Sequence, residues 1–360
     1  MSLPSSDQVR PWLRAAALDP AALPDEGYEA LLGADGDQLD ELCALADTLR
    51  SQAVGDDLTY VVNRNLDTAA VAGNDPEARK RLTALVREAW DLGATEICMQ
   101  GPLPPTADDD YLDLIAAVKQ AAPDIHLHAF RATELLDGAA RRNLPLEEFL
   151  KQAKAAGLGS VPGTAARVLD DGVRMRMMGR PDLPVSRWTE VIDAAHQAGL
   201  TSTSTLVFGH VETPGHQVAH LRLLAGIQAK TNGFTEFIAM PFVPAAANVT
   251  APGLIEDKDL SGPDWRQSRA LHAVARLILH GKINNIQAAW PKYGLEPSVE
   301  LLRGGANDLG GLLLDGRLAP DAGAEAGLAL TRDDAARVAS ELGRKLRQRT
   351  TRYGEVPSGA

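Results

Sequence analysis

Residues 58–100, LTYVVNRNLDTAAVAGNDPEARKRLTALVREAWDLGATEICMQ, decide the fold of this chain. The stretch begins and ends with short apolar runs that have the length and composition of buried strands. Between them, residues 77–90 have the spacing of an amphipathic helix, with Pro76 suited to its first turn and Asn74 or Asp75 to its cap. The stretch is therefore one strand-helix-strand unit, the repeating unit of parallel α/β folds.

Apolar strand candidates alternate with amphipathic helices through the rest of the chain. We expect strands at 58–64, 96–100, 125–129, 159–161, 202–208, 236–241, 285–289 and 307–312, separated by helices such as 111–122, 146–156, 185–199, 214–231 and 265–280. This alternation predicts an α/β fold, a (β/α)8 TIM-type barrel or its partly open variant, whose active face is the C-terminal ends of the strands. We place N-terminal helices in 1–55, the barrel in 56–342, and a basic arm and tail in 343–360.

Composition narrows the classes of function. The chain has 36 Lys and Arg against 48 Asp and Glu, a formal charge of -12, which argues against a nucleic-acid surface. No apolar run approaches the roughly 20 residues of a membrane span, and no signal peptide is recognisable, so we expect a cytoplasmic protein. Two cysteines in 360 residues predict no disulfide framework.

Residues 343–353, GRKLRQRTTRY, gather basic side chains near one end of the chain. A site for nucleic acid or for an acidic partner is one interpretation. A solvated or barrel-bracing arm agrees better with the net negative charge of the whole chain. We expect residues 355–360 to form a loose tail.

Several short motifs follow one another along the chain: TYVVNRN (59–65), GATEICMQG (93–101), DIHLHAF (124–130), GLGSVPGTAARVLDD (157–171), FGHVETP (208–214), GFTEFIAMPFVP (233–244), NNIQAAW (284–290), GGANDLGG (304–311) and RQRTTRYG (347–354). Together they resemble the radical S-adenosylmethionine (SAM) family of FO synthase, second subunit or C-terminal half, and of aminofutalosine synthase. The resemblance implies a barrel that uses SAM and an iron–sulfur cluster, the cluster held by three thiolates of a CxxxCxxC loop after the first strand.

The chain departs from this family pattern at three places. It has no cysteine between Asn65 and Trp90, where the family has its cluster loop. Pro102 replaces the second glycine of the family's QGG, which removes an N–H near the amino group of SAM. Arg167 replaces the glutamate of GTAAE, a change that favours an anionic ligand. We therefore expect a degenerate family member with no iron–sulfur cluster and a weakened SAM contact.

The polar residues of the motifs predict a pocket for a polar small molecule at the barrel mouth. His126 and His128, two apart on one strand, project to the same side, the barrel interior. They line the pocket or, in a lower alternative, bind a metal ion together with His210. Thr164 is expected as a helix N-cap. The predicted substrate-binding residues are Tyr60, Asn63, Arg64, Gln100, His126, His128, Thr164, Arg167, Phe208, Gln287, Trp290 and Asn307.

His210, Glu236 and Asp308 are the predicted catalytic residues, because imidazole titrates near neutrality and a nearby carboxylate completes an acid/base pair. One hypothesis is an enzyme that performs non-radical acid/base chemistry in deazaflavin, quinone or specialised-metabolite biosynthesis. The other is an inactive substrate-binding or partner subunit that assists a radical SAM enzyme. Lower alternatives are a His-based metal enzyme and radical chemistry with cysteines supplied by a partner. A small molecule is the expected partner, and a homo-oligomer or a partner biosynthetic enzyme is left open.

Overall fold

The computed structural model describes residues 6–73, 75–108, 110–243, 261–312, 314 and 330–356. The Asn74 cap and the tail beyond residue 356 lie outside the described residues. The strands are β1 (Asp57–Val61), β2 (Asn63–Asp67), β3 (Glu96–Gln100), β4 (His126–Ala129), β5 (Leu158–Val161), β6 (Thr201–Phe208), β7 (Phe234–Pro241), β8 (Ile286–Gln287), β9 (Asp308–Gly311) and β10 (Lys345–Gln348).

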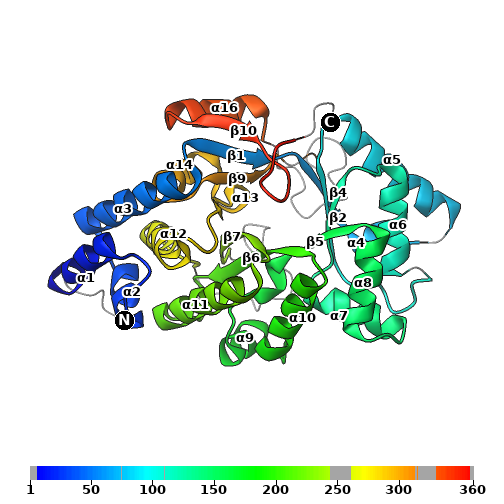
Figure 1. Ribbon diagram of the computed structural model, residues 1–360, viewed down its shortest axis with the longest axis horizontal. Helices are drawn as coiled ribbons and strands as arrows, with labels where there is room; N and C mark the ends of the chain where they lie inside the picture. Colours follow the sequence, from blue (N-terminus) through cyan, green and yellow to red (C-terminus); the bar gives the residue numbers. More distant parts are fainter. Residues whose placement is uncertain are drawn as a thin grey trace.

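The helices lie outside the strands and surround them (Figure 1). They are α1 (Ser6–Leu18), α2 (Asp25–Leu32), α3 (Gly36–Val54), α4 (Thr68–Val71), α5 (Pro76–Asp91), α6 (Tyr111–Ala121), α7 (Ala132–Arg141), α8 (Leu146–Ala156), the 3-10 helix η1 (Gly163–Ala166), α9 (Asp171–Met178), α10 (Val185–Gln197), α11 (Pro214–Thr231), α12 (Trp265–Leu279), α13 (Trp290–Tyr293), α14 (Leu295–Arg303) and α16 (Arg332–Glu341). None of the helices in the described part of the chain is long and apolar enough to span a membrane.

All ten described strands form one parallel sheet, in the order β10-β1-β9-β8-β7-β6-β5-β4-β3-β2. The predicted α/β barrel is confirmed, because consecutive strands from β3 to β9 are neighbours and the helices cover the outer face. Most predicted strands appear with ends shifted by one or two residues. The strand predicted at 285–289 is reduced to the two residues of β8.

The strand predicted at 58–64 is two strands separated by Val62. β1 pairs with β9 and β10, whereas β2 pairs with β3, so one continuous segment contributes to both ends of the sheet order. The backbone N–H groups of Leu312 and Leu314 donate to the carbonyls of Val61 and Asn63. The chain after β9 therefore stays paired with this segment on both sides of Val62. The segment that decides the fold therefore also brings the two ends of the sheet together.

One local prediction is confirmed around the strands. Asp75 caps α5 by accepting hydrogen bonds from the backbone N–H groups of Glu77 and Ala78, each at 3.0 Å, and Pro76 opens the helix. The N-terminal helices pack on the side of the barrel, where Arg266 of α12 donates to the Leu32 carbonyl at 2.9 Å. β10, in contrast, is a strand inside the segment that the sequence predicts as a basic arm.

Candidate functional site

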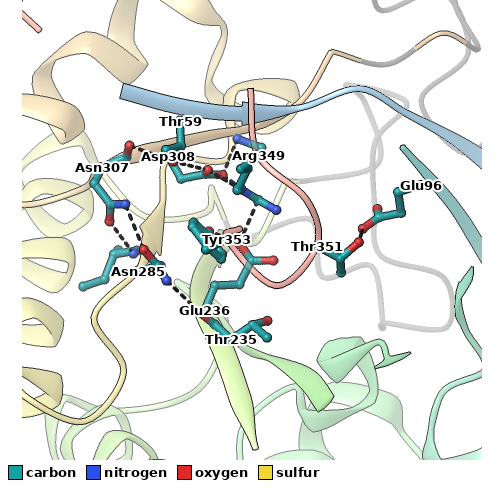
Figure 2. A network of polar contacts seen from close by, with 12 residues as sticks. Thr59, Glu96, Thr235, Glu236, Asn285, Asn307, Asp308, Arg349, Thr351 and Tyr353 are labelled. Carbon is teal, nitrogen blue, oxygen red and sulfur yellow. Dashed lines mark hydrogen bonds and ion pairs between the residues drawn. The ribbon is translucent and has the colours of Figure 1, made fainter. Parts of the chain in front are cut away.

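Two buried carboxylates on β7 and β9 share one arginine (Figure 2). Arg349 donates from Nε and Nη2 to both oxygens of Asp308, at 2.6 and 2.8 Å, and from Nη2 to Glu236 Oε2 at 3.1 Å. Thr59 Oγ1 and the Gly310 N–H also donate to Asp308, at 2.5 and 2.7 Å. Asp308 therefore has the full set of donors that an ionised carboxylate needs in a buried site.

Arg349 belongs to residues 349–353, which we call the C-terminal plug. After β10 this segment turns into the barrel interior, where Thr351 Oγ1 donates to Glu96 Oε2 of β3 at 2.6 Å. Tyr353 Oη donates to Glu236 Oε2 at 2.5 Å, and its ring lies 4.0 Å from the Arg349 guanidinium carbon. Glu96, Glu236 and Asp308 all lie in the N-terminal halves of their strands. The plug therefore closes the barrel at that end, opposite the predicted active face.

A second polar group lines the other side of the interior. Since Glu96 faces the plug, the residues two and four positions later on β3, Cys98 and Gln100, face the same way. Register places Asn63 of β2 and His126 of β4 beside Glu96, and Asn65 of β2 and His128 of β4 beside Cys98. We call the following set the interior polar wall: Asn63, Asn65, Gln100, His126, His128 and Ser160.

Ser160 of β5 joins the two histidines of the wall. Its hydroxyl lies 2.7 Å from His126 Nε2 and 2.6 Å from His128 Nδ1. The prediction that His126 and His128 share one side of the strand is confirmed by this common partner. Burial lowers the pKa of His126 to about 4 and that of His128 to about 3, so both imidazoles are neutral at pH 7. Gly159 is required here, because a side chain would collide with the His126 ring.

The upper part of the wall meets the segment after β5. Thr164 Oγ1 donates to Gln100 Oε1 at 2.7 Å, and Gln100 Nε2 donates to Cys98 Sγ at 3.1 Å. Thr164 lies inside the 3-10 helix η1, and no side-chain cap is formed there, so its predicted role as a helix N-cap is wrong. Its hydroxyl instead orients Gln100 within the wall.

Three residues predicted to line the pocket face away from the interior. Arg64 donates to the Leu85 carbonyl of α5 at 2.6 Å. Asn307 accepts from Arg276 of α12 at 3.1 Å. Tyr60 follows Thr59 and therefore points outward, where burial raises its pKa and Arg332 of α16 acts against that shift. These placements correct the prediction, because neighbours of the inward-facing Thr59, Asn63 and Asp308 must face outward on a pleated strand.

Of four further predicted residues, three lie near the C-terminal ends of the strands, and Gln287 lies level with Asp308. Arg167 is paired with Asp182 through Nε at 3.0 Å, so its charge is already matched by a carboxylate. Trp290 donates from Nε1 to the Gly311 carbonyl at 3.0 Å. Gln287 pairs in register with Asp308 and packs against Gly310, on the interior side. Phe208 ends β6 and lines a cavity together with His210.

His210 lies beyond β6 in that cavity of about 260 Å³, away from the other two predicted catalytic residues. Its backbone N–H donates to Glu212 Oε2 at 3.0 Å, and its ring packs edge-on against Phe242. The carboxylate beside His210 is thus Glu212, and the structure does not bring His210 together with Glu236 or Asp308. Catalysis by any of the three stays a prediction. Across the described ranges, no cluster of three or more His, Cys, Asp or Glu suits a metal ion.

The residues of the C-terminal plug are the part of the site that sequence reasoning missed. A cluster of basic residues is usually solvent-exposed, yet Arg349 is 2% exposed. The usable signal was the pair Glu236 and Asp308, two carboxylates in strands that contain no basic residue. Buried carboxylates require a partner, and the motif RQRTTRYG carries one.

Comparison with solved structures shows the class of fold. HydG, a maturase of hydrogenase, superposes with a TM-score of 0.68 at 14% identity, covering 96% of this chain and 76% of HydG. Methylornithine synthase (PylB) superposes with a TM-score of 0.62 at 16% identity, covering 93% of this chain and 97% of that one. The chain thus has the α/β barrel of these enzymes.

Sequence comparison then shows the family, although no family model matches the chain. FO synthase of Nocardia farcinica is 45% identical over 361 residues, covering 96% of this chain but 41% of the relative. The 5-amino-6-(D-ribitylamino)uracil–L-tyrosine 4-hydroxyphenyl transferase of Methanothermobacter thermautotrophicus is 37% identical over 343 residues, covering 91% of this chain and 92% of the relative. The chain belongs to the family of FO synthase and this transferase, and it spans about two fifths of the length of the FO synthases it matches.

Family membership contradicts the prediction that no iron–sulfur cluster is expected, because FO synthases and their radical SAM relatives use a cluster and SAM. The residues of this chain do not by themselves supply the family's three thiolates. Cys43 lies in α3, where burial raises the pKa of its thiol, and Cys98 lies in β3 beside Gln100.

Proposed function

We propose that the barrel interior binds a polar small molecule of the kind named for the methanogen relative, a ribitylaminouracil together with tyrosine. The chain would act in biosynthesis of a deazaflavin-type product, in the cytoplasm. The observation that carries the proposal is the interior itself, where the interior polar wall on β2–β5, with Glu96 beside it, faces a charged group on β7, β9 and the plug. An interior that is polar on both sides, in a barrel otherwise packed with apolar residues, is characteristic of a ligand site.

The interior polar wall supports the uracil half of this proposal. Amide side chains such as Asn63 and Gln100 offer both donors and acceptors, as does a neutral imidazole, and these match the alternating N–H and C=O groups of a uracil ring. The hydroxyls of a ribityl chain need the same kind of partners. Because the His126 and His128 pKa values are lowered, the wall carries no charge at pH 7 and suits an uncharged ligand.

The charged side supports acid/base chemistry. Burial raises the pKa of Glu236 to about 7, with Asp308 and Glu96 adding to the shift and Arg349 and Tyr353 opposing it. A carboxyl group that titrates near the working pH can both accept and donate a proton. Glu236 is therefore the proposed acid/base residue, and Asp308 is its anionic neighbour. His210 lines the separate cavity beyond β6 and is proposed to contact ligand there.

A second candidate function is that of a substrate-binding partner in a larger reaction. It is favoured by the length of the match, since the chain spans only 41% of the Nocardia FO synthase. In this case the barrel would hold one substrate while another chain performs the chemistry. The two candidates differ in whether the chain alone transforms its ligand.

Isothermal titration of the full chain tests the proposal. We expect saturable binding of 5-amino-6-(D-ribitylamino)uracil, weakened about fivefold by Ser160→Ala, because loss of one hydrogen-bonding group in the wall costs about 1 kcal/mol. Ser186→Ala, at an exposed position of α10, is the matched control and should bind as the parent does. Absence of binding for both the uracil and tyrosine in a folded protein would rule the proposal out.

The same anaerobic preparation should be titrated with SAM while its iron content is measured. Conversion of the bound uracil by the chain alone supports the enzyme, and binding without conversion supports the partner. The SAM and iron values show which family cofactors this chain carries.

A further inference from the structure

The C-terminal plug contacts residues of four strands of the barrel. Arg349 reaches β9 and β7, Thr351 reaches β3, and Arg352 Nη2 lies 3.4 Å from the Gly159 carbonyl of β5. The plug also holds its own shape. Tyr353 N–H donates to the Thr350 carbonyl at 2.9 Å, and Thr350 N–H donates to the Gly354 carbonyl at 3.1 Å. A rigid turn therefore presents its side chains to the interior.

The two carboxylates bound by Arg349 are held differently. Both oxygens of Asp308 accept hydrogen bonds, from Arg349, Thr59 and Gly310. Glu236 accepts through Oε2 alone, from Arg349 and Tyr353, and its Oε1 has no hydrogen bond from the described residues. In Figure 2, the dashed contacts of the Glu236 carboxyl group likewise reach a single side of it. Asp308 is thus a fixed anion, whereas Glu236 has one oxygen available.

We propose that the plug is part of the ligand site, with Arg349 and Tyr353 as positioning residues that hold Glu236 by Oε2 and leave Oε1 to exchange a proton with a polar ligand. This inference rests on the proposed function and deepens it. In the forward step, an N–H or O–H of the ligand gives its proton to Oε1 of the ionised carboxylate. The ligand becomes an anion and Glu236 a neutral acid, and the reverse step restores both.

The charges around Glu236 are consistent with such an exchange. The groups that act on it are Arg349 and Tyr353 from the plug, Asp308 from β9 and Glu96 from β3. Arg349 is balanced by Asp308, so protonation of Glu236 leaves the group of three without net charge, and ionisation adds one negative charge. Burial disfavours that added charge. The two hydrogen-bond donors on Oε2 stabilise it and so partly offset the effect of burial.

Calorimetric titration of the full chain with 5-amino-6-(D-ribitylamino)uracil, in buffers of different ionisation enthalpy, counts the protons exchanged on binding. Between pH 6 and 8.5 the parent protein should show an exchange centred near pH 7, and Glu236→Gln should abolish it while still binding. Tyr353→Phe keeps the ring on Arg349 but removes the donor to Oε2. Its exchange should move upward by about one pH unit, because the ionised carboxylate loses a hydrogen bond.

Arg347→Gln is the matched control from the same segment. Arg347 lies in β10, two residues before the plug, and pairs with Asp57 at 2.6 Å at a half-exposed position. Its replacement should leave both the binding and the proton exchange unchanged. If Glu236→Gln does not fold, as judged by its melting temperature, the milder Tyr353→Phe decides the question.

The outcomes separate this inference from the proposed function. If the parent protein binds neither the uracil nor tyrosine, the proposed function fails and the inference fails with it. If the parent binds the uracil but Glu236→Gln and Tyr353→Phe exchange protons as the parent does, the proposed function stands and the inference is overturned.

Discussion

The two sides of the barrel interior handle buried polar groups in opposite ways. On β2–β5 the members of the interior polar wall are neutral, because burial keeps His126 and His128 uncharged, and the Ser160 hydroxyl is their common partner. On β7 and β9 the groups are charged, and Glu236 and Asp308 depend on Arg349. The neutral side is completed by neighbouring strands, whereas the charged side needs a segment from a distant part of the sequence. One barrel therefore combines a polar wall built by neighbouring strands with a charged group that is completed by a distant segment.

Among substitutions, the largest expected effect comes from removing the cation of the charged side. Arg349→Met leaves Asp308 and Glu236 buried without their counter-ion, and we expect it to lower the free energy of unfolding by about 3–5 kcal/mol. Urea unfolding followed by circular dichroism measures this. Arg347→Gln, which breaks a half-exposed pair, should cost less than about 1 kcal/mol. Equal effects of the two changes would show that the comparison between the two sides is wrong.

A further variant sharpens the same point. In Glu236→Gln/Asp308→Asn/Arg349→Met no charge remains in the group, so the triple variant should regain part of the stability lost by Arg349→Met alone. No recovery would mean that Arg349 acts through packing of its side chain rather than through its charge.

The buried histidines, of the polar wall and of the surrounding helices, predict the pH dependence of stability. The lowered pKa values of His126, His128, His196, His220 and His272, at about 3 to 4, arise from burial. The unfolded chain, with histidine near 6.5, binds these protons first, so stability is present above pH 6.5 and is lost as the pH falls towards 4. Each extra proton contributes a slope of about 1.4 kcal/mol per pH unit.

Glu236 acts in the opposite sense within the same range. Its pKa is raised to about 7, so its contribution to stability is present below the unfolded value of 4.5 and is lost as the pH rises through 7. Because one carboxyl group opposes several histidines, the net result is acid destabilisation between pH 6.5 and 4. Urea unfolding at steps of half a pH unit measures it, and a flat or rising stability over that range would contradict the expectation.

The smallest expected effect comes from the centre of the polar wall. Ser160→Ala removes the hydroxyl that contacts both His126 and His128, and should cost about 1–3 kcal/mol because two buried ring nitrogens lose their partner. Thermal unfolding measures it against Ser186→Ala, which should be neutral. A loss of stability as large as that of Arg349→Met would mean that folding depends equally on the two sides of the interior.

The same contrast explains what could be predicted from the sequence. The succession of strands and helices along the chain and the common orientation of His126 and His128 follow from local periodicity. Both could therefore be predicted from the sequence. Local periodicity would also have separated the predicted pocket residues into inward-facing and outward-facing ones. Asn63 and Arg64 cannot both face inward, nor can Asn307 and Asp308.

Two features were beyond local patterns. The break at Val62 that makes β1 and β2 separate strands is imposed by pairing with β9 and β3, which lie far away in sequence. The entry of residues 349–353 into the interior contradicts the usual exposure of basic clusters. It is explained only by carboxylates 41 and 113 residues earlier in the chain. Charge pairing over such distances has no signature in a local window.

The plug also has a consequence for biosynthesis of the protein. Glu236 is synthesised 113 residues before Arg349, and Glu96 is synthesised 255 residues before Thr351. At about 5–20 residues per second, Glu236 waits roughly 6–20 s on the ribosome before its cation is made. Long-range contacts of this kind form late in folding. Nascent chains stalled at residue 340 should therefore be cleaved by protease within the barrel, and chains in which residue 356 has left the ribosomal tunnel should resist it.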